Sequence, residues 1–227
     1  MKSKLLEICC FNVESAKAAK AAGADRIEFC SPKFSGGGTP SENDFLEVKK
    51  IGIRTFMMLH PREGDYCYDD KAFCLLKQQG TRFKEMGVQG LVFGILDSKK
   101  NIDIPRSREL INYFSPVGVT LHKAFDETAD VFKALEDAIQ CGFKRILTSG
   151  TKPTALKGKK ILAELVKRAD GRISIMIGGG VRSINIDRFF ETGATEFHSS
   201  ALLPSETISS EAEIKSMLDK MKSVSIA

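Results

Sequence analysis

The sequence has no tryptophan, only three histidines among its 227 residues, and no long apolar run. Its longest apolar stretches are far shorter than the roughly 20 residues that a membrane-spanning helix needs. Glu7 interrupts the start of the chain before the apolar region of a signal peptide can form. Basic segments with interleaved aromatic residues are also missing, and the net charge is only +5. We therefore expect a soluble, cytoplasmic protein that binds neither a membrane nor a nucleic acid, whereas an anionic small molecule fits the mild positive charge.

The six cysteines show no Cys-x-x-Cys spacing, so a zinc knuckle is not indicated. In a reducing cytosol we expect all six to be thiols, and their positions then matter more than their even number. Cys67 falls in a loop pattern, and Cys74 and Cys141 fall in helical patterns. Cys9 and Cys30 instead belong to apolar, β-rich runs, which makes them the two cysteines of interest.

Short apolar runs alternate with helical segments along the whole chain. The eight runs that we predict as strands are 5–10, 26–30, 54–60, 91–96, 117–122, 145–149, 173–178 and 195–199. Several helical segments end at a glycine, such as Gly23 and Gly142, because glycine adopts the left-handed conformation that terminates a helix. The last segment, about 210–222, has apolar residues at helical spacing and is predicted to be the helix that closes the fold.

Eight strand–helix units of about 28 residues each predict a (β/α)₈ TIM barrel, an α/β fold that forms a single domain over residues 1–227. An open, doubly wound sheet is the alternative. It is less favoured because no edge strand is evident, no Gly-x-Gly-x-x-Gly turn follows the first strand, and no shift in composition marks a second domain.

Side-chain alternation predicts which residues point into the barrel. It places Glu7 and Cys9 inward on the first strand, and Glu28 and Cys30 inward on the second. Adjacent strands lie about 4.8 Å apart, so both thiols are expected to reach one ion, and soft thiolates prefer Cu(I) or zinc. The alternative is that both cysteines serve only as small buried hydrophobic side chains.

All three histidines, His60, His122 and His198, close predicted strands. The carboxyl ends of barrel strands are where binding and catalytic sites are built, so three imidazoles there favour proton transfer or metal ligation. For any one of them, a hydrogen-bonded structural role is the alternative.

An anion pocket is predicted at the loops after the seventh and eighth strands, where such barrels often hold phosphate. Gly179, Gly180 and Ser199 supply the backbone and hydroxyl groups, and Arg62 from the loop after the third strand could grip the same anion. The glycines could instead serve only a tight turn, and Arg62 could instead hold its own loop through Asp65.

Nine ordered segments over roughly residues 4–201 resemble the CutC copper-homeostasis family: LEICC, GADRIEFC, GGGTPS, HPREGDYCY, GLVFGILD, HKAFD, RILTSG, GGGVR and EFHSSA. The resemblance implies a (β/α)₈ barrel, a cytoplasmic location, homo-oligomers of dimer size or larger, and copper handling with Cu(I) binding. Cys9 and Cys30 match the two cysteines that the family is proposed to use as Cu(I) ligands. No organic cofactor is implied.

Two residues depart from the family pattern. His60 stands where the family usually has an arginine, and Lys123 replaces the arginine that usually follows the histidine of the fifth strand. Lysine keeps the charge but loses the bidentate geometry, and His60 changes an anion contact into an imidazole.

Two functions therefore compete. The first is a copper-homeostasis protein that binds Cu(I) through Cys9 and Cys30. The second is a barrel enzyme, of lyase, isomerase or hydrolase type, that acts on an anionic or phosphorylated small molecule with Glu7, Glu28 and His122 as acid–base groups. A purely structural protein would not explain the inward charges, and no Gly-x-Ser-x-Gly nucleophile motif is present.

Overall fold

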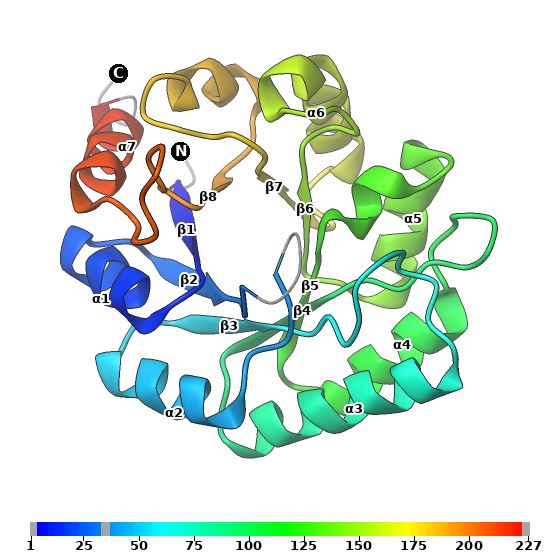
Figure 1. Ribbon diagram of the computed structural model, residues 1–227. Helices are drawn as coiled ribbons and strands as arrows, with labels where there is room; N and C mark the ends of the chain where they lie inside the picture. The colour runs from blue at the N-terminus through cyan, green and yellow to red at the C-terminus, as the bar shows by residue number, and fades with distance from the viewer. Residues whose placement is uncertain (1–3, 33–36, 224–227) are drawn as a thin grey trace.

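The computed structural model describes residues 4–32 and 37–223, and its eight parallel strands form a closed barrel in chain order. Figure 1 shows the strands at the centre and the helices around them. The strands are β1 (Leu5–Cys10), β2 (Arg26–Phe29), β3 (Thr55–Met58), β4 (Gly90–Phe93), β5 (Gly118–Leu121), β6 (Arg145–Thr148), β7 (Ser174–Ile177) and β8 (Glu196–Ser199). The predicted (β/α)₈ barrel is confirmed, and each strand lies within or close to its predicted run.

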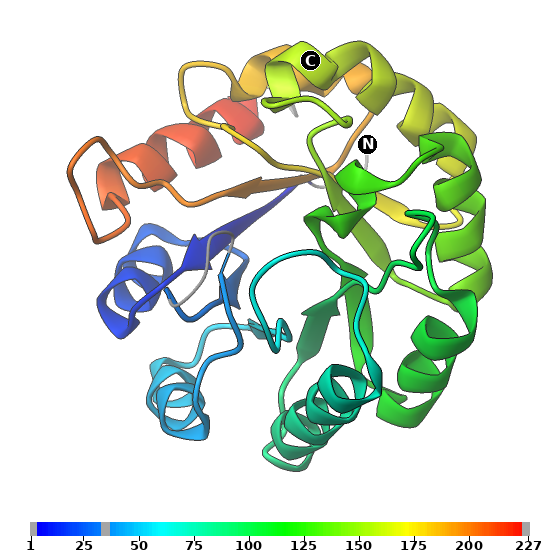
Figure 2. The same ribbon diagram turned by 45° about the vertical axis from the view of Figure 1, so that its right-hand side comes forward.

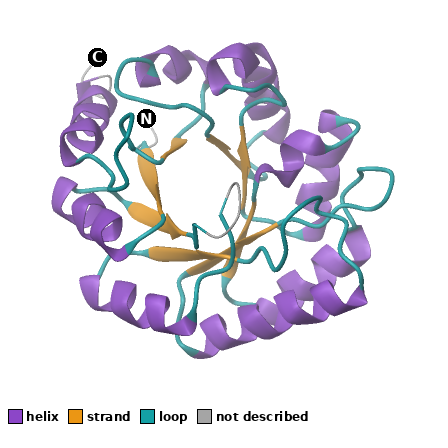
Figure 3. Ribbon diagram, viewed as in Figure 1, coloured by secondary structure: helices purple, strands orange, loops and turns teal. Residues whose placement is uncertain are grey.

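Helices follow the strands as an outer ring, which Figure 3 shows by secondary structure. The α-helices are α1 (Val13–Ala22), α2 (Glu42–Ile51), α3 (Asp70–Glu85), α4 (Ile104–Phe114), α5 (Val131–Cys141), α6 (Ala155–Ala169) and α7 (Glu211–Ser223). Two 3₁₀ helices complete the set, η1 (Lys123–Glu127) and η2 (Ile186–Thr192). The connection between β7 and β8 is thus a 3₁₀ helix. The predicted last helix is α7, which lies beside α1 and completes the ring (Figure 1).

The turn from α1 to β2 shows how the sequence sets the repeat. Asn12 caps the start of α1 by accepting a hydrogen bond from the Ser15 backbone N–H at 2.8 Å. Gly23 ends the helix with φ +89°, and its N–H donates to the carbonyls of Ala19 and Lys20. The chain reverses direction there and enters β2 at Arg26. β2 therefore runs parallel to β1.

The barrel has an outer and an inner core. The outer core lies between strands and helices and contains the outward side chains, such as Leu6, Ile8 and Ile27, all fully buried. The inner apolar cluster is small and lies inside the barrel; its members are Cys9, Cys30, Phe56, Met58 and Val92, with Phe11 packed against them. The turned view of Figure 2 shows the helices outside the strands. Within the described ranges, no helix has both the length and the apolarity to cross a membrane.

Candidate functional site

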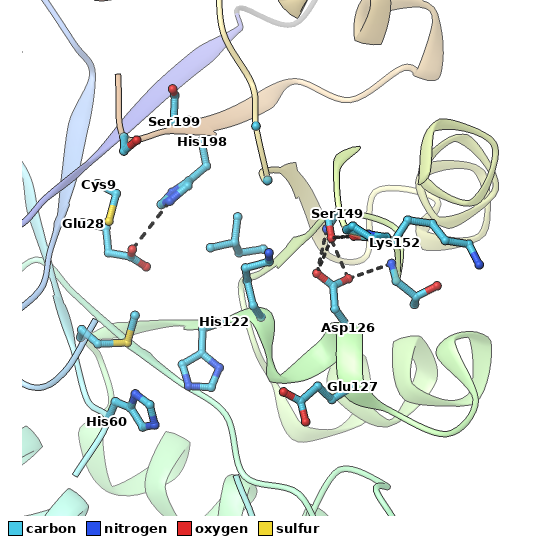
Figure 4. Close-up of a pocket in the computed structure, with 18 of the residues that line it drawn as sticks. Cys9, Glu28, His60, His122, Asp126, Glu127, Ser149, Lys152, His198 and Ser199 are labelled. Carbon is cyan, nitrogen blue, oxygen red and sulfur yellow. Dashed lines mark hydrogen bonds and ion pairs between the residues drawn. The ribbon is translucent and has the colours of Figure 1, made fainter. Parts of the chain in front are cut away.

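A cavity of about 640 Å³ lies at the C-terminal mouth of the barrel. Cys9, Glu28, His122 and His198 line it together with residues of the surrounding loops, as Figure 4 shows. These side chains come from β1, β2, the end of β5 and β8, and they point inward as their alternation predicts. The mouth therefore combines thiol, carboxyl and imidazole groups in one place.

The predicted thiol pair forms. Cys9 Sγ lies 3.9 Å from Cys30 Sγ, and Cys30 Sγ lies 3.5 Å from Glu28 Oε2. Cys30 is fully buried and Cys9 is 7% exposed, at the floor of the cavity. The strand register pairs Cys9 with Glu28, so the two cysteines sit diagonally across the β1–β2 ladder. A site for one soft ion between two sulfurs is compatible with this arrangement.

The two thiols differ in acidity. A hydrogen bond from Cys30 favours the Cys9 thiolate, and although burial opposes ionisation, His198 adds to the effect and the pKa of Cys9 falls to about 5. The same hydrogen bond, together with burial, raises the pKa of Cys30 well above its usual value. At neutral pH the pair is therefore one thiolate and one thiol.

His198 bridges the two buried glutamates. Its Nδ1 lies 2.8 Å from Glu7 Oε1. Its Nε2 lies 3.7 Å from Glu28 Oε2, a contact that Figure 4 marks with a dashed line. Burial alone would lower the pKa of His198, but Glu28, Cys9 and Glu7 outweigh burial and raise the pKa well above its usual value. His198 is therefore an imidazolium that joins β8 to β1 and β2.

Glu7 is fixed by an arginine that the sequence analysis did not single out. Arg26 Nε donates to Glu7 Oε2 at 2.5 Å, and its other end donates to Glu196. Burial would raise the pKa of Glu7, but Arg26 and His198 lower it to about 2. Arg26 occupies the same inward face as Glu28 and Cys30, at a spacing of two residues, and this spacing was the available signal.

Glu28 behaves in the opposite way. Burial and the neighbouring Cys9 thiolate raise the pKa of Glu28 well above its usual value. Among the described residues, its Oε1 atom has no hydrogen-bond partner although it is buried. These surroundings therefore favour the protonated form of Glu28, which lines the cavity.

Charged groups inside the barrel lie in pairs of opposite sign. Glu196 also receives a hydrogen bond from Arg145 Nε at 2.9 Å. The negative groups are Glu7, Glu196 and Cys9, and the positive groups are Arg26, Arg145 and His198. Such a paired network lowers the cost of burying charge, and breaking one pair would leave a partner uncompensated.

The three histidines do not form one cluster. His60 and His122 lie together, with ring centroids 6.1 Å apart, whereas His198 belongs to the glutamate group. His122 Nδ1 accepts a hydrogen bond from the Ala124 N–H at 3.2 Å, so its Nε2 carries the proton. That Nε2 is buried without a partner in the described part of the chain. Burial and His60 lower the pKa of His122 to about 3, which makes it a neutral donor.

The glycines after β7 line the cavity in left-handed conformations, with φ +100° at Gly179 and +80° at Gly180. Within residues 4–32 and 37–223, the N–H groups of these two glycines donate no hydrogen bond. Ser199 also lines the cavity, but its hydroxyl donates to the Val181 carbonyl at 2.7 Å. Arg182, which was not predicted, donates to Ser199 Oγ at 2.8 Å and ties these loops together. It directly follows the glycine–valine segment in the sequence.

Arg62 lies outside the cavity lining. Its guanidinium donates to Asp65 Oδ1 at 2.7 Å and to the Cys67 carbonyl at 2.6 Å, and so holds its own loop. Lys123 does line the cavity, at the start of η1. His60, the other departure from the family pattern, contacts the Gly37 carbonyl through Nδ1 at 2.9 Å and so supports the loop after β2.

Asp126 is a further cavity residue that the sequence analysis missed. Its carboxylate accepts hydrogen bonds from the Thr148 hydroxyl, from the Ser149 N–H at 2.9 Å and from the Thr151 N–H at 3.0 Å. Thr148 is the last residue of β6, and Ser149 and Thr151 lie in the loop that follows it. Asp126 therefore holds the rim of the cavity in place. Its carboxylate oxygens are already occupied by these hydrogen bonds and have little capacity left to bind a ligand.

Known proteins resemble the chain over most of its length. The CutC family model matches residues 4–203. A family protein CutC of Photorhabdus laumondii is 43% identical over 197 residues, which are 86% of this chain and 79% of the relative. A family protein CutC of Citrobacter koseri is 42% identical over 198 residues, which are 87% of this chain and 79% of the relative.

Solved structures also resemble the chain. A protein of Streptococcus agalactiae, described as a candidate copper homeostasis protein CutC, matches with a TM-score of 0.82 at 30% identity, over 87% of this chain and 98% of that chain. A thiamine phosphate pyrophosphorylase of Pyrococcus furiosus matches with a TM-score of 0.64 at 15% identity, over 97% of this chain and 96% of that chain. The second likeness shows the barrel fold alone.

Proposed function

The chain belongs to the CutC family, and we propose that it takes part in copper homeostasis by binding Cu(I) as cargo through Cys9 and Cys30. The observation that carries the proposal is the pair of sulfurs, 3.9 Å apart and both buried, with Cys9 in the lining of the mouth cavity. Thiolates are soft ligands and select Cu(I) over the harder ions.

The register of β1 and β2 supports a metal-binding role over a disulfide. Because Cys9 pairs with Glu28, Cys30 is offset from Cys9 by two residues along the ladder. Strand spacing and rise then put the two Cα atoms about 8 Å apart, beyond the span of a disulfide. The side chains converge although the backbones do not, so the sulfurs can share an ion while remaining two thiols.

Groups next to Cys9 and Cys30 favour metal binding by the two sulfurs. Cys9 is already a thiolate beside the His198 imidazolium, so one ligand is available without losing a proton. Cys30 must give up its proton on metal binding, as thiol ligands do. The apolar side chains of Phe56 and Val92 exclude water from the sulfurs on the inner side. A cytoplasmic location, where thiols stay reduced, and homo-oligomer formation belong to the same proposal.

An anaerobic Cu(I) titration against a chromogenic chelator tests the proposal. We expect the wild type to bind one Cu(I) and a Cys9→Ser/Cys30→Ser variant to lose that binding. A Cys67→Ser/Cys74→Ser variant is the matched control, since both of these cysteines lie outside the inner cluster. Equal affinity in the wild type and the Cys9/Cys30 variant would eliminate this site.

A second candidate function has its own supporting observation. The cavity is far larger than a single ion needs, and His122 Nε2 is buried in its lining without a partner in the described residues. An unpaired buried donor costs free energy unless a ligand accepts its hydrogen bond. We therefore also propose an anionic or phosphorylated small molecule as ligand, held near Gly179 and Gly180, with turnover of lyase, isomerase or hydrolase type.

The acid–base roles can be refined for this candidate. Glu7 is locked between Arg26 and His198 with a pKa of about 2, so it orients His198 and is a poor proton carrier. Glu28 holds a proton at the cavity wall and is the better general acid. His122 serves as a neutral hydrogen-bond donor.

Thermal shift measurements with inorganic phosphate and a panel of phosphorylated metabolites test the second candidate. We expect at least one ligand to raise the melting temperature of the wild type and to do so less in His122→Gln. If no compound shifts the wild type, and a high-resolution map with added phosphate has no anion at Gly179, the candidate fails.

A further inference from the structure

The spacing of the thiol pair leaves room for a third donor. With a metal–thiolate bond of about 2.3 Å, two sulfurs on opposite sides of an ion stand about 4.6 Å apart. Cys9 Sγ and Cys30 Sγ are only 3.9 Å apart, so an ion touching both lies off the line between them. An ion in that position has one side open, and a further ligand fits there.

Met58 is placed to supply that ligand. The β2–β3 register pairs Phe29 with Met57, so the next pair along the ladder is Cys30 with Met58. Alternation then puts Met58 on the inner face of the barrel, as Phe56 is two residues earlier. Met58 is 3% exposed, belongs to the same inner cluster as Cys9 and Cys30, and lines the mouth cavity beside Cys9.

We propose that the thioether of Met58 is the third ligand of Cu(I), completing a three-sulfur site with Cys9 and Cys30. This inference rests on the proposed function. The other side chains of the inner cluster are hydrocarbons, and Met58 contributes its one further sulfur in the described residues. A thioether is soft, as Cu(I) requires, and it is neutral, so it brings no further charge into the buried site.

Glu28 is the competing third ligand, since its Oε2 lies 3.5 Å from Cys30 Sγ. A carboxylate oxygen is a hard ligand and suits Cu(I) less well than sulfur does. A bound Cu(I) would have a third sulfur neighbour if Met58 binds it and an oxygen neighbour if Glu28 binds it. The two candidates can therefore be distinguished by experiment.

Met57 provides a matched control within the same strand. It is fully buried, one residue away, and packs in the outer core between the barrel and the helices. Met57→Leu and Met58→Leu therefore make the same chemical change on opposite faces of β3. We expect Met58→Leu to lower the Cu(I) affinity roughly 10- to 100-fold, the range for loss of a supporting group at a metal site, and Met57→Leu to leave it unchanged.

X-ray absorption at the copper edge measures the ligands directly. Three sulfur neighbours in the wild type and in Met57→Leu, with two in Met58→Leu, are the expected result. Two sulfurs in all three proteins, or two sulfurs and one oxygen in the wild type, would overturn the role of Met58. Loss of binding in Cys9→Ser/Cys30→Ser alone would then still support the thiol pair, whereas unchanged binding there would overturn the proposed function itself.

Selenomethionine labelling tests the role of Met58 in the wild-type protein, so the test does not require the Met58→Leu variant to fold. In labelled wild-type protein loaded with Cu(I), the selenium edge should report a copper neighbour for about one of the seven methionines. The signal should persist in Met57→Leu. Absence of any copper–selenium contact in the labelled wild type would overturn the proposal even if Met58→Leu does not fold.

Discussion

Glu7 Oε1 and His198 Nδ1 lie 2.8 Å apart across the seam where β1 meets β8, although 191 positions separate the two residues in sequence. The contact fixes the imidazole so that its other edge faces Glu28 and the cavity floor. The orientation of His198, and through it the environment of Cys9, therefore depends on a carboxylate at the beginning of the chain.

Replacing Glu7 by Gln should be strongly destabilising. The change removes one negative charge from the network and leaves the Arg26 guanidinium and His198 imidazolium short of a counter-charge in a buried place. We expect a loss of about 3–5 kcal/mol in the free energy of unfolding, measured by urea denaturation at pH 7. Glu14→Gln, at an exposed ion pair with Lys17, is the control and should change stability by less than about 1 kcal/mol. Equal effects of the two changes would contradict the paired network.

Replacing Glu28 by Gln should be mild in comparison. A protonated carboxyl and an amide have similar shape and no charge, and no arginine in the described ranges binds Glu28. We expect the free energy of unfolding at pH 7 to change by no more than about 1 kcal/mol, again by urea denaturation. A loss as large as that of Glu7→Gln would mean that Glu28 is ionised in the folded protein.

His122 should make stability depend on pH. Its pKa is about 3 in the folded protein and near 6.5 when unfolded, so the unfolded chain takes up the proton first as the pH falls. The contribution of neutral, buried His122 to the free energy of unfolding is fully present above pH 6.5. It is lost as the pH falls toward 3. From pH 7 to pH 4.5, wild type should lose about 2–3 kcal/mol more than His122→Gln, measured by denaturation at both pH values. Parallel losses in the two proteins would refute a neutral, buried His122.

Cys9 and Cys30 should resist forming a disulfide with each other. Their sulfurs are close, but the diagonal register keeps the backbones about 8 Å apart, and closing the bond would require the strands to move. After incubation of the metal-free protein with oxidised glutathione, peptide mapping by mass spectrometry should find no Cys9–Cys30 cross-link. A cross-link in high yield would show that the β1–β2 register shifts readily in solution.

The barrel and the inward faces of its strands were predictable because they depend on local periodicity. Alternation along β1 and β2 was enough to place Glu7, Cys9, Glu28 and Cys30 inside, and the ends of the strands then defined one rim. The same rule applied to Arg26 would have placed it inside as well. Its pairing with Glu196, 170 positions away, could not be read from the sequence because it depends on how the barrel closes.

The chemistry of the rim was predictable only in part. The sequence placed His60, His122 and His198 at strand ends, but the division into a pair and a single imidazole depends on which strands they occupy around the ring. Of the two roles considered for Arg62, the anion pocket and its own loop, the structure shows its donors on its own loop. The opposite pKa shifts of Glu7 and Glu28 follow from neighbours on other strands, which no local pattern specifies.

The closing of the ring has a consequence for biosynthesis. β8 is the last strand to leave the ribosome, and it carries Glu196 and His198 to partners made at the very start of the chain. Until it docks, a nascent chain has Cys9 and Cys30 but not the imidazolium beside them or the second counter-ion of Arg26. A metal ion or metabolite that meets the nascent chain before β8 docks would therefore find an incomplete site.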